Sequence, residues 1–143
     1  MSSKKIKVLF VGLSNKPDLE PFDTKTNSGK VVGMIVKSLD CECYKVNIVS
    51  YAPLDENNRL RYPTKTEIQD SVSDFISYIN KLSPNLIVSF GNIVSNTLRK
   101  IDCVKNITLY KKHPSYMYIY KRKHLDKYVE DIVIEINKYK AQM

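Results

Sequence analysis

Short apolar runs that alternate with helical patterns are the feature that most constrains the fold of this chain. The runs are rich in β-branched side chains, as buried strands are. They cover residues 7–11, 46–49, 86–90 and 107–109. Outside them, apolar residues recur every three or four positions, which is typical of one face of a helix. These helical patterns cover residues 30–39, 68–82, 93–99 and 125–136.

The alternation of strands and helices predicts an α/β fold, a three-layer sandwich with a central, mainly parallel four-stranded sheet. Ser28 is the expected N-cap of the first helix, and Thr64 with Glu67 fits a capping box before the second. The polar stretch from Pro53 to Pro63 predicts a loop. The basic, tyrosine-rich segment before the last helix is also expected to be a loop.

The ends of the strands are where we expect the functional residues. Ligands of open parallel sheets bind beyond the carboxyl ends of the strands. The loops after the first, second and fourth strands carry proline, polar and basic residues, whereas the loop after the third strand shows less sign of function. The sequence therefore predicts one cleft on which these loops converge.

Length and charge bound the number of domains and the kind of partner. With 143 residues, of which 43% are hydrophobic, the chain can bury one core, so we expect a single domain over residues 1–143 and a monomer. The 23 Lys and Arg residues outnumber the 15 Asp and Glu residues, and the resulting charge of +8 favours a polyanionic partner. A basic surface that serves only solubility is the alternative.

The lengths of the apolar runs and the spacing of the cysteines indicate the cellular compartment that we expect for this protein. No apolar run reaches the roughly 18 residues that a membrane span needs, and the polar residues 1–7 lack the apolar core of a secretory signal. We therefore expect no membrane partner and a cytoplasmic location. Cys41, Cys43 and Cys103 form no pair of C-x-x-C motifs, so reduced thiols and no metal are expected.

Four segments of the chain, taken in order, resemble the motifs of the uracil-DNA glycosylase superfamily, and most closely its small fourth and fifth families. The segments are VLFVGL at residues 8–13 with Pro21-Phe22 and Ser28-Gly29-Lys30, VNIVSYAP at residues 46–53 with Asn58-Arg59, Pro63-Thr64 and Glu67, LIVSFGN at residues 86–92, and His113-Pro114-Ser115. Each string alone is weak, but their joint order over residues 6–136 is specific. The resemblance implies a uracil-DNA glycosylase-like fold.

The resemblance also implies that the partner is DNA and that the substrate is a base flipped out of the duplex. In that case His113 donates a hydrogen bond to the base carbonyl oxygen on which negative charge develops, and Ser115 grips a phosphate. Asn47 reads the edge of the base, and Phe22 stacks beneath its ring. An ordinary structural histidine, a turn asparagine and a core phenylalanine are the alternatives.

The first loop departs from the family pattern. Leu13 stands where the fourth family carries a water-activating Glu. Asp18 and Asn15 are the candidates for the missing catalytic groups, with Glu20 or Asp23 as other possible carboxylates and plain turn roles as the alternative. The cysteines that hold the iron–sulfur cluster of the fourth family are absent, so no cofactor is expected.

The segment around His113 supplies cations and bulky side chains. Lys112, Lys121 and Arg122 are candidates for phosphate contacts, and Tyr116 is a candidate for wedging or stacking against bases. A solvated basic turn whose tyrosines pack on the core is the alternative.

These features together predict a monofunctional DNA glycosylase that hydrolyses the N-glycosidic bond of uracil or of a modified, larger pyrimidine and leaves an abasic site. It would serve base-excision repair or defence against modified foreign DNA. The alternative is a catalytically inactive DNA-binding protein of the same fold that acts as a sensor or competitor, which Leu13 favours. An enzyme for free nucleosides is disfavoured, because such substrates need no basic wedge segment.

Overall fold

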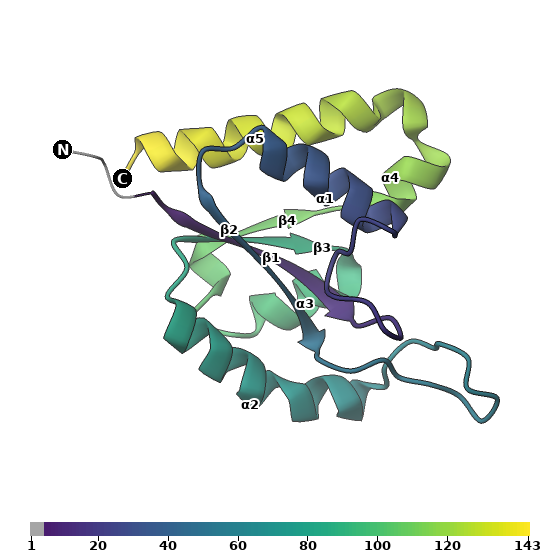
Figure 1. The fold of residues 1–143 in the computed structure, drawn as a ribbon. Helices are drawn as coiled ribbons and strands as arrows, with labels where there is room; N and C mark the ends of the chain where they lie inside the picture. The colour runs from purple at the N-terminus through teal and green to yellow at the C-terminus, as the bar shows by residue number, and fades with distance from the viewer. Residues whose placement is uncertain (1–4) are drawn as a thin grey trace.

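A four-stranded parallel sheet forms the centre of the computed structural model, which describes residues 5–143. Residues 1–4, part of the predicted domain and of the polar start, lie outside the described residues. The strands are β1 (Lys7–Ser14), β2 (Glu42–Val49), β3 (Leu86–Phe90) and β4 (Thr108–Lys111). Their order in the sheet is β2-β1-β3-β4, with every neighbouring pair parallel (Figure 1). The predicted α/β fold with a four-stranded sheet is confirmed.

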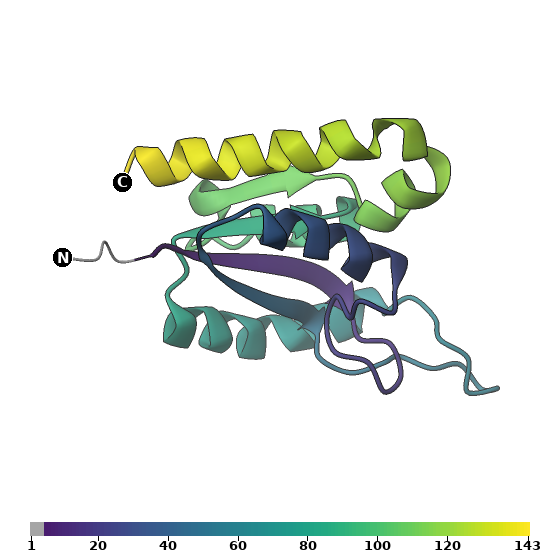
Figure 2. The same cartoon turned by 45° about the horizontal axis from the view of Figure 1, so that its top comes forward.

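Five helices cover the two faces of the sheet. One face carries α1 (Asn27–Lys37), α4 (Pro114–Tyr120) and α5 (Leu125–Ala141), and the other carries α2 (Lys65–Leu82) and α3 (Asn92–Arg99). Figure 2 shows the resulting three layers with the sheet in the middle. Two short 3₁₀ turns, η1 (Lys105–Ile107) and η2 (Arg122–His124), complete the connections. No helix in the described part of the chain is long and apolar enough to cross a membrane.

The two apolar cores lie on opposite sides of the sheet and explain the continuous apolar runs. Val8 and Phe10 of β1 point toward α1 and α5, whereas Leu9 and Val11 point toward α2 and α3. Successive side chains of a strand face opposite sides, so a strand buried on both faces is apolar at nearly every position. The buried Ser89 of β3 is an exception, and its hydroxyl is hydrogen-bonded to that of Ser95 (2.9 Å). Residues of β3 alternate in the same way, and the whole strand is buried.

Helix boundaries differ from the sequence prediction at two places. Thr26, not Ser28, is the N-cap of α1, because its hydroxyl accepts from the Gly29 amide (2.9 Å) and the helix has already begun at Ser28. The predicted loop after β4 is in fact the helix α4, which Pro114 starts at a position where proline is tolerated. The capping box of Thr64 and Glu67 is confirmed.

β3 lies where predicted, whereas β1 and β4 end later and β2 begins earlier than predicted. The first half of β2 is only partly buried. Residues 53–63 form the predicted irregular segment, with one isolated bridge between Leu54 and Leu60.

All three cysteines are free thiols. Cys41 and Cys43 pack against the core beside α5, and burial raises the pKa of the Cys43 thiol to about 11.

Candidate functional site

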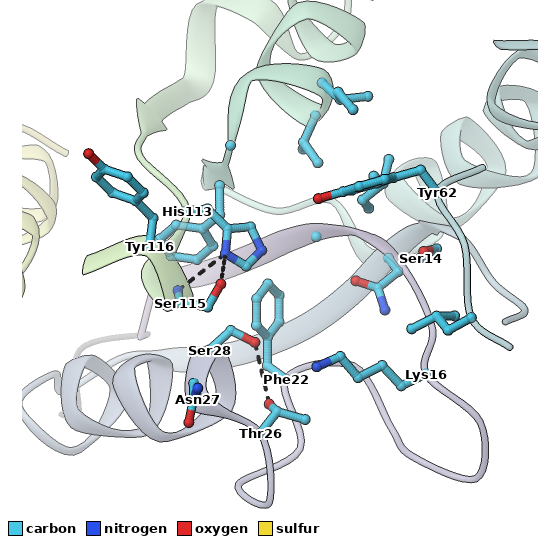
Figure 3. A pocket seen from close by; sticks show the side chains of 18 of the residues that line it. Ser14, Lys16, Phe22, Thr26, Asn27, Ser28, Tyr62, His113, Ser115 and Tyr116 are labelled. Atoms are coloured by element: carbon cyan, nitrogen blue, oxygen red, sulfur yellow. Dashed lines mark hydrogen bonds between the residues drawn. The ribbon is translucent and has the colours of Figure 1, made fainter. Parts of the chain in front are cut away.

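A cleft of about 780 Å³ opens at the carboxyl ends of the strands (Figure 3). The segments after β1, β2, β3 and β4 all contribute to its lining. This is the cleft that parallel topology predicts. The expectation that the segment after β3 contributes less is wrong, because Gly91 and the first turn of α3 line the cleft as well.

The floor of the cleft holds Phe22 and Asn47, each only 8% exposed. The Phe22 ring packs edge-on against Phe90, with 5.6 Å between ring centroids. Gly12 is paired with Asn47 in the register of β1 and β2. A Cβ atom at Gly12 would overlap Asn47 Oδ1 and lie 3.0 Å from Phe22 Cζ, so only glycine leaves room for both side chains.

Hydrogen bonds fix the orientation of the Asn47 amide. Asn15 Nδ2 donates to the Ser50 carbonyl (2.9 Å), which can only accept, so Asn15 Oδ1 must be the acceptor for Asn47 Nδ2 (2.8 Å). Asn47 Oδ1 then accepts no hydrogen bond from the described residues and lies over Gly12. Asn15 therefore positions Asn47 and does not itself line the cleft.

His113 is held as a neutral hydrogen-bond donor. The Ser115 amide donates to His113 Nδ1 (3.2 Å), and Ser115 Oγ lies 2.7 Å from the same atom. Because a backbone N–H can only donate, Nδ1 is an acceptor and the proton of the neutral ring sits on Nε2. Burial, and then the Lys16 cation, lower the pKa of His113 below its usual 6.5. Figure 3 shows the ring above Phe22, with Nε2 turned away from Ser115 toward the cleft.

The first loop brings a different carboxylate into the cleft from the one expected. Asp18 is exposed in a left-handed turn (φ 58°) and lies outside the lining. Asp23 also lies outside it and accepts from the Lys25 amide. Among residues 5–143, Glu20 is the carboxylate-bearing residue of the lining. Lys16 accompanies it (Figure 3).

Large apolar side chains surround the mouth of the cleft. Tyr116 and Tyr120 of the basic, tyrosine-rich segment belong to this rim, and four further members were not expected from the sequence. These are Leu60, Tyr62, Ile93 and Ile119, all of them exposed. Ile119 and Tyr120 lie three and four positions after Tyr116, a spacing that places them on its face once α4 is seen as a helix.

Comparisons with known proteins bear on the fold. No family model and no curated protein matches this chain. Among solved structures it is similar to wild-type SMUG2 of Pedobacter heparinus, a glycosylase of the uracil-DNA glycosylase superfamily. The TM-score is 0.63 at 13% sequence identity, over 96% of this chain and 77% of that one. This chain has a uracil-DNA glycosylase-like fold. The likeness shows the fold, and the roles of the cleft residues stay predictions.

The three basic residues predicted to contact phosphates are not part of the cleft lining. Lys112 and Lys121 are exposed and outside its lining. The Arg122 guanidinium stacks on Tyr118, 3.7 Å from the ring centroid, and donates to the Tyr118 carbonyl (2.8 Å). Within residues 5–143, no three His, Cys, Asp or Glu side chains are grouped to hold a metal ion.

Proposed function

We propose that this protein is a DNA glycosylase that hydrolyses the N-glycosidic bond of a pyrimidine flipped into the cleft and leaves an abasic site. The observation that carries the proposal is the neutral His113, whose Nε2–H faces a floor made of Phe22 and Asn47. A donor of fixed direction, an aromatic ring and a side-chain amide are what excision of a flat, polar base requires.

Asn47 supports recognition of a uracil-like edge. Its Oδ1 is open to accept from a ring N–H, and its second Nδ2 hydrogen is available to donate to a carbonyl. Uracil presents these two groups side by side. Phe22 would stack on the ring, and the free space of the cleft leaves room for a larger, modified pyrimidine.

In the proposed reaction, negative charge develops on the base and positive charge on the sugar at C1′. When the bond between the base and C1′ breaks, its electrons go to the base, and the negative charge on the carbonyl oxygen is stabilised by His113 Nε2–H. The lowered pKa of His113 keeps this donor neutral. Water adds to C1′ and gives up a proton, and the base anion takes up a proton, so the products are a C1′ hydroxyl and a free base. Glu20 takes the carboxylate role that we first assigned to Asp18, since Glu20 lines the cleft and Asp18 does not.

DNA is the partner in this proposal. A charge of +8 and the exposed Lys112 and Lys121 favour contacts with phosphates. The activity belongs to base-excision repair or to defence against modified foreign DNA, in the cytoplasm. A DNA-binding protein without catalysis is the second candidate, because Leu13 replaces the family's Glu and Glu20 is exposed.

Alkali-dependent strand cleavage of labelled oligonucleotides tests the proposal. The panel carries uracil, hypoxanthine, 5-hydroxymethylpyrimidines and glycosylated pyrimidines. We expect one substrate to be cleaved, and His113→Ala to lose about 10²-fold or more of that activity. His124→Ala is the matched control, because His124 is exposed in η2 and lies outside the cleft. Tight DNA binding without cleavage of any substrate would overturn the enzyme and leave the binding protein.

A further inference from the structure

The segment between β2 and α2 forms an arm, residues 51–62 (Figures 1 and 2). Its residues Leu60, Arg61 and Tyr62 line the cleft. Main-chain hydrogen bonds fold its tip back on itself. The Asp55 amide donates to the Arg59 carbonyl (2.8 Å), and the Arg61 amide donates to the Pro53 carbonyl (3.0 Å). Asp55 Oδ1 also accepts from the Arg59 amide (2.9 Å). The arm therefore has a defined shape although it is no regular element.

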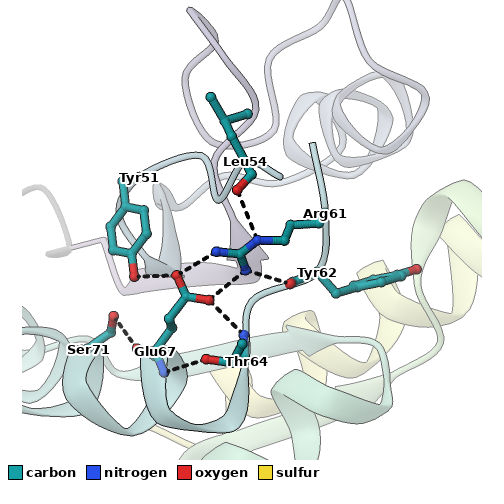
Figure 4. A network of polar contacts seen from close by, with 7 residues as sticks. All are labelled: Tyr51, Leu54, Arg61, Tyr62, Thr64, Glu67 and Ser71. Carbon is teal, nitrogen blue, oxygen red and sulfur yellow. Dashed lines mark hydrogen bonds and ion pairs between the residues drawn. The ribbon is translucent and has the colours of Figure 1, made fainter. Parts of the chain in front are cut away.

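A single carboxylate fastens the arm to the first turn of α2 (Figure 4). Glu67 pairs with Arg61 through both oxygens (2.6 and 3.3 Å) and accepts from the Tyr51 hydroxyl (3.1 Å). Arg61 Nε donates in turn to the Leu54 carbonyl (3.0 Å). Bidentate pairs of an arginine with a carboxylate fix the relative orientation of the two groups as well as the distance between them. Both ends of the arm are thus tied to one point.

This anchoring presents a tyrosine at the mouth of the cleft. Tyr62 is 78% exposed, and Figure 3 shows its ring reaching in from the side opposite Tyr116. On the α4 side, Tyr116 and the 71% exposed Tyr120 lie with ring centroids 5.4 Å apart. Exposed aromatic rings therefore border the cleft on two sides.

The depth of the cleft separates these rings from the floor. Phe22 and Asn47 are almost fully buried, so a base that reaches them lies below the level of Tyr62. Tyr62 can then contact the part of the DNA that stays outside the cleft. In DNA with one nucleotide extruded, the neighbouring bases expose a flat face at the gap, and aromatic side chains stack on such faces without regard to sequence.

We propose that the arm is a second DNA-binding element, in which Tyr62 stacks on a base that flanks the extruded nucleotide while α4 contacts the other side of the gap. The inference rests on the proposed function, because it requires DNA in the cleft. The stacking of Tyr62 on a flanking base is a contact that a free nucleoside could not make.

The experiment uses the full chain and a duplex that carries a tetrahydrofuran abasic analogue with 2-aminopurine beside it. Stacking of 2-aminopurine on an aromatic side chain quenches its fluorescence. We expect Tyr62→Ala to weaken binding about tenfold and to abolish the quenching, as loss of one base-stacking contact would. Tyr62→Phe keeps the ring and should behave as the wild type. Ile134→Ala removes an exposed apolar side chain of α5 outside the cleft and is the control.

The outcomes separate the inference from the proposed function. Wild-type-like affinity and quenching in Tyr62→Ala would overturn the role of the arm. Failure of the wild-type protein to bind this duplex would overturn the proposed function and the arm together. Loss of binding in Tyr62→Ala combined with no base excision on any substrate would support the arm and overturn only the glycosylase.

Discussion

Gly12 and Asn47 illustrate how single residues shape the floor of the cleft. They are paired across β1 and β2, and the space that a Cβ would need at Gly12 is taken by Asn47 Oδ1 and the Phe22 ring. Neither neighbour is free to move, because Asn15 holds the Asn47 amide and Phe90 packs against Phe22. The positions of the Asn47 amide and of the Phe22 ring therefore depend on the absence of a side chain at residue 12.

We predict opposite effects for two glycine substitutions. Gly12→Ala should lower the free energy of unfolding by about 1–3 kcal/mol, because overpacking forces buried neighbours to shift, and it should weaken binding of target DNA. Gly33→Ala is the matched control: nothing lies within 4 Å of its new Cβ in the middle of α1. It should raise the free energy of unfolding by about 0.5–1 kcal/mol. Urea unfolding measures both, and equal effects would contradict the close approach.

His113 shows that a residue's chemistry depends on its partners. The His-Pro-Ser motif indicates a role for the histidine, but the identity of the protonated nitrogen follows from the Ser115 amide. Burial lowers its pKa most, and the cation that lowers it further comes from Lys16, almost a hundred positions earlier in the chain. The motif identifies the residue, whereas its neighbouring groups in the fold decide its protonation state and tautomer.

At the scale of elements, α4 and the arm are the parts that the sequence described least well. Residues 114–120 contain tyrosines, which favour strands over helices, yet His113 caps the segment and Pro114 starts it as a helix. The arm has no periodic pattern, and its shape depends on Arg61 and Glu67. Neither element could be recognised from hydrophobic periodicity, because one is short and the other irregular.

Glu67→Gln should loosen the arm without removing the cap of α2. Glutamine can still accept from the Thr64 amide but cannot pair as an ion with Arg61. We expect faster hydrogen exchange at the Asp55 and Arg61 amides, measured as protection factors by NMR. Arg61→Gln, which removes the charge of the other partner of the ion pair, should have the same effect. Unchanged protection in both variants would show that the ion pair does not hold the arm.

The same ion pair predicts how the arm responds to acid. Hydrogen bonds from Arg61 and Thr64 lower the pKa of Glu67 from its usual 4.5 to about 2. A carboxyl group whose pKa is lowered by folding stabilises the folded state above its unfolded pKa, and this contribution is lost as the pH falls through the folded value. Protection of the arm should therefore be constant above about pH 5 and decline toward pH 2.

At the scale of the whole molecule, net charge bears on the proposed association with DNA. An excess of eight positive charges on 143 residues predicts binding that weakens steeply with salt, because each neutralised phosphate releases counterions. Lys112 and Lys121 are exposed and adjoin, in sequence, the cleft residues His113 and Tyr120. Lys138 lies in the last turn of α5, and the C-terminal end of this helix is at the opposite side of the sheet from the carboxyl ends of β1 and β2 (Figure 1).

We expect Lys112→Ala and Lys121→Ala each to reduce the slope of log K against log salt by about 1. Lys138→Ala should leave the slope unchanged. Fluorescence anisotropy of labelled duplex DNA over a series of salt concentrations provides the measurement. A uniform reduction by all three variants would mean that DNA is attracted by net charge alone and has no preferred face.

The amino-acid sequence by itself determined the elements and the layers of this protein. Hydrophobic periodicity located β3 at Leu86–Phe90 and indicated helices on both faces, and the capping box before α2 was found from two residues. These signals are local, since a strand, a helix face or a cap is formed by residues that are close in the chain.

Only the tertiary structure decided which polar groups meet in the cleft. It brought Glu20 into the lining in place of Asp18, joined Asn15 to Asn47 and set Tyr62 opposite Tyr116. Such neighbours lie far apart in sequence, and their contacts depend on strand register, on turn conformation and on the packing of whole helices. No local pattern encodes these quantities, because they result from the burial of two apolar cores around one sheet.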